Sequence, residues 1–221
     1  MISSTSRQIF IAGATGYTGR VLVPLIAKSS EWKPIAHVRP GSRHVDFLPP
    51  DIERREVDLA DTVALISAMA GCEAVVSLIG TTRAQFGPSV SYETVDIGTT
   101  QLLVTAAKQA KVKRFVLLSS VGASETGVAY LHAKAAAEKT VMTSGLDWIV
   151  LRPSAIVGPG RQLPRLFIPL AAMLRYIPGL RRVVDDYRPV HVETLARAIF
   201  AATKWPSTTG EIWNGKIIGE N

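Results

Sequence analysis

The sequence predicts an α/β fold in which helices cover both faces of a parallel sheet. Two observations carry this prediction. Strand-like apolar runs alternate with helix-like runs along nearly the whole chain, which is the pattern of parallel strands joined by crossover helices. The chain has 221 residues, of which 47% are hydrophobic and 19% charged. This composition is sufficient for one domain with a sizeable core.

The first half of the chain is predicted to form four strands and two helices. In chain order, the predicted elements are a strand at 9–12, a helix at 17–29, strands at 34–39 and 54–58, a helix at 62–70 and a strand at 74–79. Apolar residues at helical spacing, such as Val21, Leu22 and Leu25, indicate the first helix. Asp61 is suited to cap the second helix, and Gly71 follows it in the usual stop position.

The second half continues the alternation. The predicted elements are a loop at 81–91, a helix at 92–109, a strand at 114–118, an alanine-rich helix at 130–142, a strand at 147–151 and a helix at 192–204. Residues 161–182 are predicted to be irregular because prolines interrupt their apolar turns. A short apolar tail surrounds Ile217 and Ile218. We therefore expect a single domain, 1–221, in which about residues 153–190 cap the substrate side of the sheet.

Three glycines follow the first strand at three-residue spacing: Gly13, Gly16 and Gly19. Gly13 allows a tight reversal, Gly16 lets the backbone approach a pyrophosphate, and Gly19 lets the next helix pack closely on its strand. The free N–H groups and positive end of that helix favour phosphates. With a strand before it and a helix after it, the turn predicts a dinucleotide site in a Rossmann-like, doubly wound sheet, rather than a merely structural turn.

The segment after the second predicted strand indicates which dinucleotide binds. An NAD-selective fold usually has an acid there, about 20 residues past the glycines, to bind the ribose hydroxyls. Residues 35–43 contain no acid, whereas Arg39, Ser42 and Arg43 cluster together. Because a guanidinium matches a phosphate in charge and geometry, the sequence predicts NADP(H) in preference to NAD(H). The alternative is that these are ordinary surface arginines.

Tyr130 and Lys134 form a second motif, after the glycine turn. Residues four apart on a helix lie on the same face, so the phenol and the ammonium are neighbours. A nearby cation favours the phenolate, which makes Tyr130 a better proton donor and acceptor near neutral pH. Tyr130 and Lys134 are therefore predicted to be catalytic, and Lys134 is also a candidate for holding the nicotinamide ribose.

These motifs resemble those of the extended and atypical short-chain dehydrogenase/reductases, and especially compact NAD(P)H-binding members of the NmrA-like and Tat-interacting-protein-like type. The turn resembles their GATGxxG motif, and Tyr130 with Lys134 resembles their catalytic pair. The segments 151–154 and 189–192 also resemble corresponding segments of this group. At Asp96 the sequence departs from the usual Val-Asn-x-x-Gly, which leaves the role of that residue open.

The resemblance also implies further site residues. A serine should orient the substrate carbonyl; Ser120 is preferred over Ser119, although both hydroxyls could merely satisfy backbone groups at the strand end. Asp58 and Leu59 fall where similar proteins contact the adenine. The other residues implied to bind the cofactor are Thr15, Tyr17 and Thr18 in the turn, Leu78, Ile79, Gly80 and Thr81 after the fourth strand, and Pro153 and Ser154 after the sixth.

Composition restricts the remaining possibilities. The formal net charge is +7, and five arginines with no acid lie between Arg161 and Val184. We interpret this basic segment as a solvated rim beside an anionic cofactor, in preference to a site for an anionic substrate, a membrane surface or nucleic acid. Four scattered histidines offer no metal-ligand spacing, so no metal site is expected. The apolar runs fall short of the about 20 residues that span a bilayer.

The sequence thus predicts an NADP-dependent oxidoreductase of the carbonyl reductase or alcohol dehydrogenase type, acting on a small organic molecule. The alternative is a non-catalytic NADP(H)-binding protein that senses redox state, which could lose the Tyr130–Lys134 pair. A single cysteine, Cys72, and a polar N-terminus without a signal core predict a cytoplasmic location. Neither the substrate nor the oligomeric state is indicated.

Overall fold

The computed structural model describes residues 6–42, 44–81, 85–161, 187–204 and 209–220. Within these ranges a seven-stranded sheet has the order β3-β2-β1-β4-β5-β6-β9, and every neighbouring pair is parallel. Its strands are β1 (Arg7–Ala12), β2 (Trp32–Val38), β3 (Glu53–Glu56), β4 (Cys72–Ser77), β5 (Arg114–Leu118), β6 (Asp147–Arg152) and β9 (Glu211–Asn214). The predicted doubly wound parallel sheet is confirmed.

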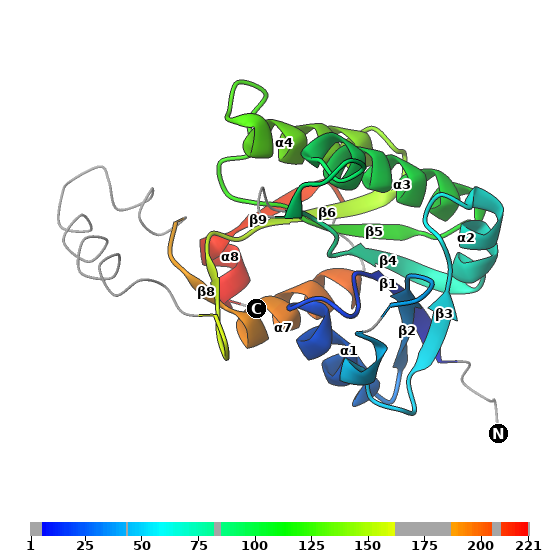
Figure 1. Cartoon of the computed structure of the whole chain (residues 1–221). Helices are drawn as coiled ribbons and strands as arrows, with labels where there is room; N and C mark the ends of the chain where they lie inside the picture. Colours follow the sequence, from blue (N-terminus) through cyan, green and yellow to red (C-terminus); the bar gives the residue numbers. More distant parts are fainter. Residues whose placement is uncertain (1–5, 43, 82–84, 162–186, 205–208, 221) are drawn as a thin grey trace.

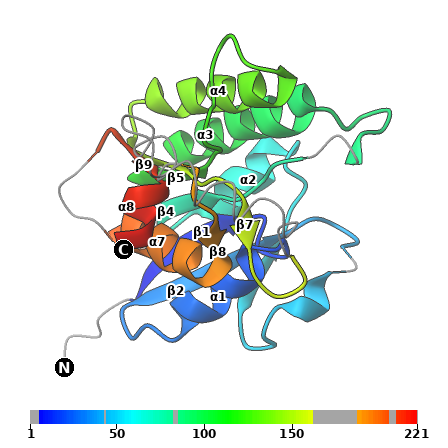
Figure 2. The ribbon, with the colours of Figure 1, turned by 90° about the vertical axis from the view of Figure 1, so that its left-hand side faces the viewer.

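Helices lie on both faces of this sheet (Figures 1 and 2), with α1 and α7 against one face and α2, α3 and α4 against the other. The α-helices are α1 (Gly19–Ala27), α2 (Thr62–Met69), α3 (Thr99–Gln109), α4 (Ala129–Met142), α7 (Val192–Lys204) and α8 (Gly215–Glu220); η1 (Val45–Phe47) is a short 3-10 helix and η3 (Tyr92–Gly98) a π-helix. Because the strand order reverses between β1 and β4, a crevice is expected at their carboxyl ends.

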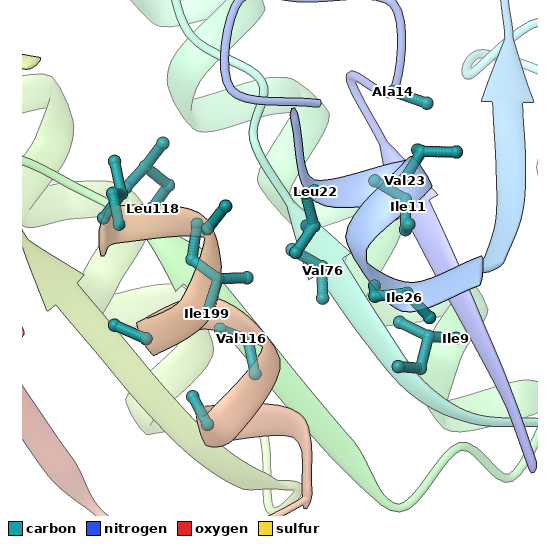
Figure 3. Close-up of a cluster of buried hydrophobic side chains, with 14 of the residues drawn as sticks. Ile9, Ile11, Ala14, Leu22, Val23, Ile26, Val76, Val116, Leu118 and Ile199 are labelled. Atoms are coloured by element: carbon teal, nitrogen blue, oxygen red, sulfur yellow. The ribbon is translucent and has the colours of Figure 1, made fainter. Parts of the chain in front are cut away.

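Each face of the sheet has its own apolar core. On the α1 and α7 side, Leu22 and Ile26 of α1 and Ile199 of α7 pack against strand residues such as Ile9 and Val116 (Figure 3). All five side chains are fully buried. Since both faces are covered, the central strands consist of nearly continuous apolar residues, as expected for parallel strands.

Several element boundaries differ from the predictions. Helix α1 begins at Gly19 rather than at residue 17, because residues 13–18 form the turn. The predicted helix at 92–109 begins with the wider π-helical turns of η3 before α3. Such wider turns occur frequently at functional sites.

The C-terminal region contains structure that the sequence pattern did not predict. The tail forms strand β9, which pairs with β6 and extends the sheet, followed by α8. Two short strands, β7 (Ile156–Val157) and β8 (Val190–His191), pair beside the sheet. Most of the predicted irregular segment at 161–182, including four of its five arginines, lies outside the described residues.

The buried imidazole of His37 makes folding depend on pH. His37 is 3% exposed, its ring centroid lies 5.7 Å from that of Phe10, and its Nε2 donates to the carbonyl of Val57 at 2.9 Å. Burial lowers the pKa of His37 below 6.5, assisted by Arg39 and opposed by the Val57 hydrogen bond. Protonation therefore favours the unfolded chain. The free energy of unfolding should keep its full value above pH 6.5 and decrease as the pH drops from 6.5 through the lower pKa of the folded state. The contribution of His37 to this decrease is at most about 1.4 kcal/mol per pH unit.

Thermal unfolding of the wild type and His37→Phe between pH 7.5 and 5 tests this prediction. The variant should show a flatter dependence of Tm on pH below 6.5. His132→Gln is the matched control, because His132 is exposed on α4. Parallel Tm curves for the wild type and His37→Phe would contradict the assignment.

Candidate active site

The glycine turn joins β1 to α1 in a conformation that excludes side chains. Gly13 has a φ of +86°, and its carbonyl accepts from the N–H of Gly16 at 3.0 Å. A Cβ on Gly19 would lie 2.4 Å from the carbonyl oxygens of both Gly13 and Ala14. Gly16 itself is exposed. The turn thus forms a smooth backbone cradle at the N-terminal end of α1, as a pyrophosphate site requires.

A cavity of about 690 Å³ opens beside this turn and brings most of the predicted site residues together. It is bounded by the glycine turn, the chain after β4, the end of β5, the start of α4 and the chain after β6. The predicted residues among its lining are Gly13, Gly16, Tyr17, Thr18, Gly19, Leu78, Ile79, Gly80, Thr81, Ser120, Tyr130, Lys134, Pro153 and Ser154.

Four described residues of the predicted set do not line this cavity. Arg39 directly follows β2, and its side chain is exposed. Strand β2 is the neighbour of β1, the strand that leads into the glycine turn. The Asp58 carboxylate accepts from the N–H of Ala60, and Leu59 packs against the core on the α2 side. The carbonyl of Thr15 accepts from Arg20 Nε at 2.8 Å. The fifth, Arg43, lies outside the described residues.

An acid that the sequence pattern missed lies against the turn that follows β2. Glu56 pairs in register with Val38, and its Oε1 accepts from the N–H of Gly41 at 3.3 Å. It therefore borders the turn that follows β2, although it belongs to the next strand. Residues 35–43 themselves contain no acid, but an acid from the neighbouring strand lies next to them in space. The β2–β3 pairing is the signal that reveals Glu56.

Lys134 is buried and pairs directly with Asp96. Its Nζ lies 2.7 Å from Asp96 Oδ1, while Asp96 Oδ2 accepts from the N–H of Thr81 at 3.2 Å. The Asp96 side chain is completely inaccessible. By comparison, Nζ is 5.8 Å from the ring centroid of Tyr130. The expected Tyr130–Lys134 proximity is present, but the ammonium charge is balanced by Asp96 rather than directed only at the phenol.

Gly80 makes room for this ion pair. A Cβ at that position would lie 2.8 Å from Lys134 Nζ and 3.3 Å from Asp96 Oδ1. A side chain at position 80 would therefore require the ammonium of Lys134 to move from its present place beside Asp96. Asp96 is the site residue whose role the sequence left open, and its position depends on η3 packing against α4.

The two serines at the end of β5 have different surroundings. Ser119 Oγ donates to the buried carboxylate of Glu138 at 2.5 Å. The same carboxylate binds the Arg152 guanidinium through two hydrogen bonds, one of them 2.8 Å from Nε to Oε1, which raises the pKa of Arg152. Ser120 Oγ makes one long bond of 3.3 Å to the carbonyl of Val121. The Ser119 hydroxyl therefore links the end of β5 to α4. The Ser120 hydroxyl has the weaker hydrogen bond of the two, so it is the one more easily turned toward a ligand.

Where the chain after β6 approaches the glycine turn, Tyr17 lines the cavity. Its hydroxyl is buried and has no hydrogen-bond partner among the described residues. Gly158 lies against it, and the Arg161 guanidinium is 5.4 Å from the ring centroid. By contrast, Ser154 Oγ is already bound to the carbonyl of Arg188 at 2.5 Å. The glycine cradle, the cavity and the unsatisfied Tyr17 hydroxyl together fit a bound dinucleotide.

Comparison with known proteins agrees with this geometry. The sequence profile of the NAD(P)H-binding family matches residues 13–164, which include the glycine turn, Tyr130 and Lys134. The chain belongs to the NAD(P)H-binding family. The resemblance to atypical short-chain dehydrogenase/reductases is thereby confirmed, and the fold is that of NAD-binding proteins.

Individual relatives support this membership. The chain is 29% identical over 207 residues to a ceramide reductase of Caulobacter vibrioides, covering 93% of this chain and 64% of that protein. It is 31% identical to the mitochondrial protein fmp-52 of Neurospora crassa, over 92% and 88% of the two chains. The structure of Bordetella bronchiseptica WbmH in complex with NAD+ superposes with a TM-score of 0.67 at 21% identity, over 95% and 75%. The chain spans about half to two thirds of the first curated relatives' lengths.

The comparisons overturn the predicted cytoplasmic location. The Neurospora crassa protein is named as mitochondrial, and so are relatives from Arabidopsis thaliana and Debaryomyces hansenii. A single cysteine and a polar N-terminus do not distinguish these locations. No helix in the described part of the chain is both long and apolar enough to cross a membrane.

Proposed function

We propose that the protein is an NADP-dependent oxidoreductase that interconverts a carbonyl group and an alcohol on a small organic substrate. The observation that carries this proposal is that the glycine turn, Tyr130, Lys134 and Ser120 all line the same cavity. A protein that only binds the cofactor does not require a phenol and a serine hydroxyl beside its dinucleotide cradle.

The roles of the residues follow from their chemistry. The glycine turn and the N-terminal end of α1 would hold the pyrophosphate, and Lys134 would hold the nicotinamide ribose. When bound, the nicotinamide supplies or accepts the hydride. In the reductive direction, the Tyr130 O–H bond breaks and its proton passes to the carbonyl oxygen of the substrate. Ser120 donates a hydrogen bond to the same oxygen, and solvent returns a proton to the phenolate.

Asp96 has a positioning role in this proposal. Its carboxylate fixes the ammonium of Lys134 in the wall of the cavity. A lysine side chain has many rotamers, and holding it in one of them prepares the site before ligands bind. Asp96 therefore acts through Lys134 and does not itself contact the reacting atoms.

The proposed domain organisation assigns residues 153–190 to the substrate side of a single domain. Its described ends support this: the chain after β6 lines the cavity, and β7 pairs with β8 immediately before α7. Arg161 also lines the cavity and is the first arginine of the basic segment. A cationic rim at this position would favour an anionic cofactor.

The preference for NADP is tested by replacing Arg39. Wild-type affinities for NADPH and NADH should differ by about tenfold or more, and Arg39→Ala should remove most of that difference because it deletes a guanidinium partner of the 2′-phosphate. Isothermal titration calorimetry measures both affinities. Arg197→Ala, an exposed arginine on α7, is the matched control and should retain the preference. Equal affinities in the wild type would contradict the assignment.

Oxidation of NADPH at 340 nm in the presence of aldehydes and ketones tests the catalytic proposal. Substrate-dependent oxidation is the expected result. Tight NADPH binding with no turnover of any carbonyl or alcohol would instead favour the non-catalytic redox sensor.

A further inference from the structure

Three aromatic rings form a continuous row that begins at the proposed proton donor. The ring centroid of Tyr130 lies 5.5 Å from that of Tyr92, at the start of η3, with an interplanar angle of 58°. Phe86 meets Tyr92 edge to face, with centroids 4.7 Å apart and an angle of 73°. We call Phe86, Tyr92 and Tyr130 the aromatic row.

The outer end of this row is open to solvent. Phe86 is 43% exposed, whereas the largest aromatic side chains of the core, such as Trp32 and Phe115, are almost completely buried. An exposed phenylalanine is unfavourable unless something covers it, because burying an aromatic ring removes a large apolar area from water. Scattered exposed apolar residues are common, but this one is connected through ring contacts to a candidate catalytic residue.

The position of the row indicates what covers it. Its inner ring, Tyr130, lines the cavity, and so does Gln85, the residue directly before Phe86. Tyr92 and Phe86 are not among the residues that line the cavity, so they continue the row beyond its Tyr130 side. A molecule whose carbonyl group reaches the Tyr130 hydroxyl would extend out of the cavity along these two rings. The occupant best placed to cover these rings is the substrate itself.

The charged side chains around Lys134 are paired with each other, which favours an uncharged substrate body beside Tyr130. The Arg161 cation in the same lining lies instead beside Tyr17. Lys134 is balanced by Asp96, and Ser119 and Arg152 are bound to Glu138. Among these groups none is left to pair with a charge on the substrate. Rings favour edge-to-face or offset contacts with other rings, so a planar apolar group complements the aromatic row.

We propose that the substrate is a carbonyl compound, or the corresponding alcohol, whose reacting carbon carries an aromatic or similarly planar apolar group that packs on Tyr92 and Phe86. This inference rests on the proposed oxidoreductase function and specifies its substrate class. Contacts with one or two rings should change kcat/KM by about tenfold.

Kinetics with three aldehydes test the inference. The value of kcat/KM for NADPH-dependent reduction should be about tenfold or more higher for 2-naphthaldehyde than for butanal, with benzaldehyde between them. Phe86→Ala should remove most of this preference. Val63→Ala, which removes a 75% exposed apolar side chain on α2, is the matched control and should preserve it. Equal kcat/KM values in the wild type, or an unchanged preference in Phe86→Ala, would overturn the inference.

A binding experiment separates this inference from the proposed function. Saturation-transfer NMR with 2-naphthylmethanol and butanol, on protein saturated with NADP+, should show contact with the naphthyl ring in the wild type and a weakened signal in Phe86→Ala. Naphthylmethanol binding without turnover of any aldehyde would support the aromatic site and contradict the proposed reaction. Turnover of the aldehydes without preferential naphthyl binding would support the reaction and overturn the aromatic site.

Discussion

Replacement of Tyr130 by phenylalanine is expected to lower kcat for carbonyl reduction by about 100-fold or more, because it removes the proposed proton donor while keeping the ring. The ring contact with Tyr92 should persist, since it does not involve the hydroxyl. The fold and the affinity for NADPH should therefore stay close to those of the wild type. Steady-state kinetics with an aldehyde that the wild type reduces, together with calorimetric NADPH titration, measure both properties.

Tyr187→Phe is the matched control for this experiment. It also deletes a phenolic hydroxyl, but Tyr187 is 55% exposed and is not among the residues that line the cavity. Its kcat should remain within about twofold of the wild type. If Tyr130→Phe retained wild-type kcat, the proton would have to come from another group, and the role assigned to Tyr130 would be wrong.

Gly19→Ala should have the largest effect on stability. The new Cβ would lie 2.4 Å from two backbone oxygens, and these oxygens belong to the turn itself, so no flexible side chain can move aside. Overpacking typically costs 1–3 kcal/mol, and a clash with backbone on two sides should cost about 3 kcal/mol or more. For a chain of this size that corresponds to a Tm lower by roughly 6–12 °C. Thermal unfolding followed by circular dichroism measures the change.

Gly16→Ala distinguishes the structural role of the turn from its binding role. A Cβ there would lie 3.1 Å from the Gly13 carbonyl oxygen, which a shift of a few tenths of an ångström relieves. Because Gly16 is exposed in the cradle, the methyl group should weaken NADPH binding much more than it lowers Tm. A Gly19→Ala variant that unfolds at the wild-type temperature would contradict the close packing of α1 on the turn.

The parts of the fold that depend on local pattern could be predicted from the sequence. The three glycines, the strand before them and the helix after them are all encoded within about a dozen residues. The proximity of Tyr130 and Lys134 is equally local, because it follows from their spacing on one helix. Strand β9 was missed because only Trp213 is buried within it. This segment is a strand because it pairs with β6, which lies far away from it in the sequence.

The relations that the sequence could not provide arise between elements. Asp96 meets Lys134 only because η3 and α4 pack together, and the two residues are 38 positions apart. The difference between Ser119 and Ser120 likewise depends on Glu138, which belongs to α4. The acid at the turn after β2, Glu56, comes from the adjacent strand β3. In each case the chemistry of a residue is set by a partner that no local motif contains.

The ion pair between Lys134 and Asp96 has a consequence for cofactor exchange. The ammonium has its counter-ion inside the protein, so this part of the cavity wall is electroneutral by itself. Departure of a dinucleotide therefore leaves no uncompensated cation in the interior, where an unpaired charge would be costly. If the protein has the proposed function, exchange of oxidised for reduced cofactor would not require a new counter-ion for Lys134.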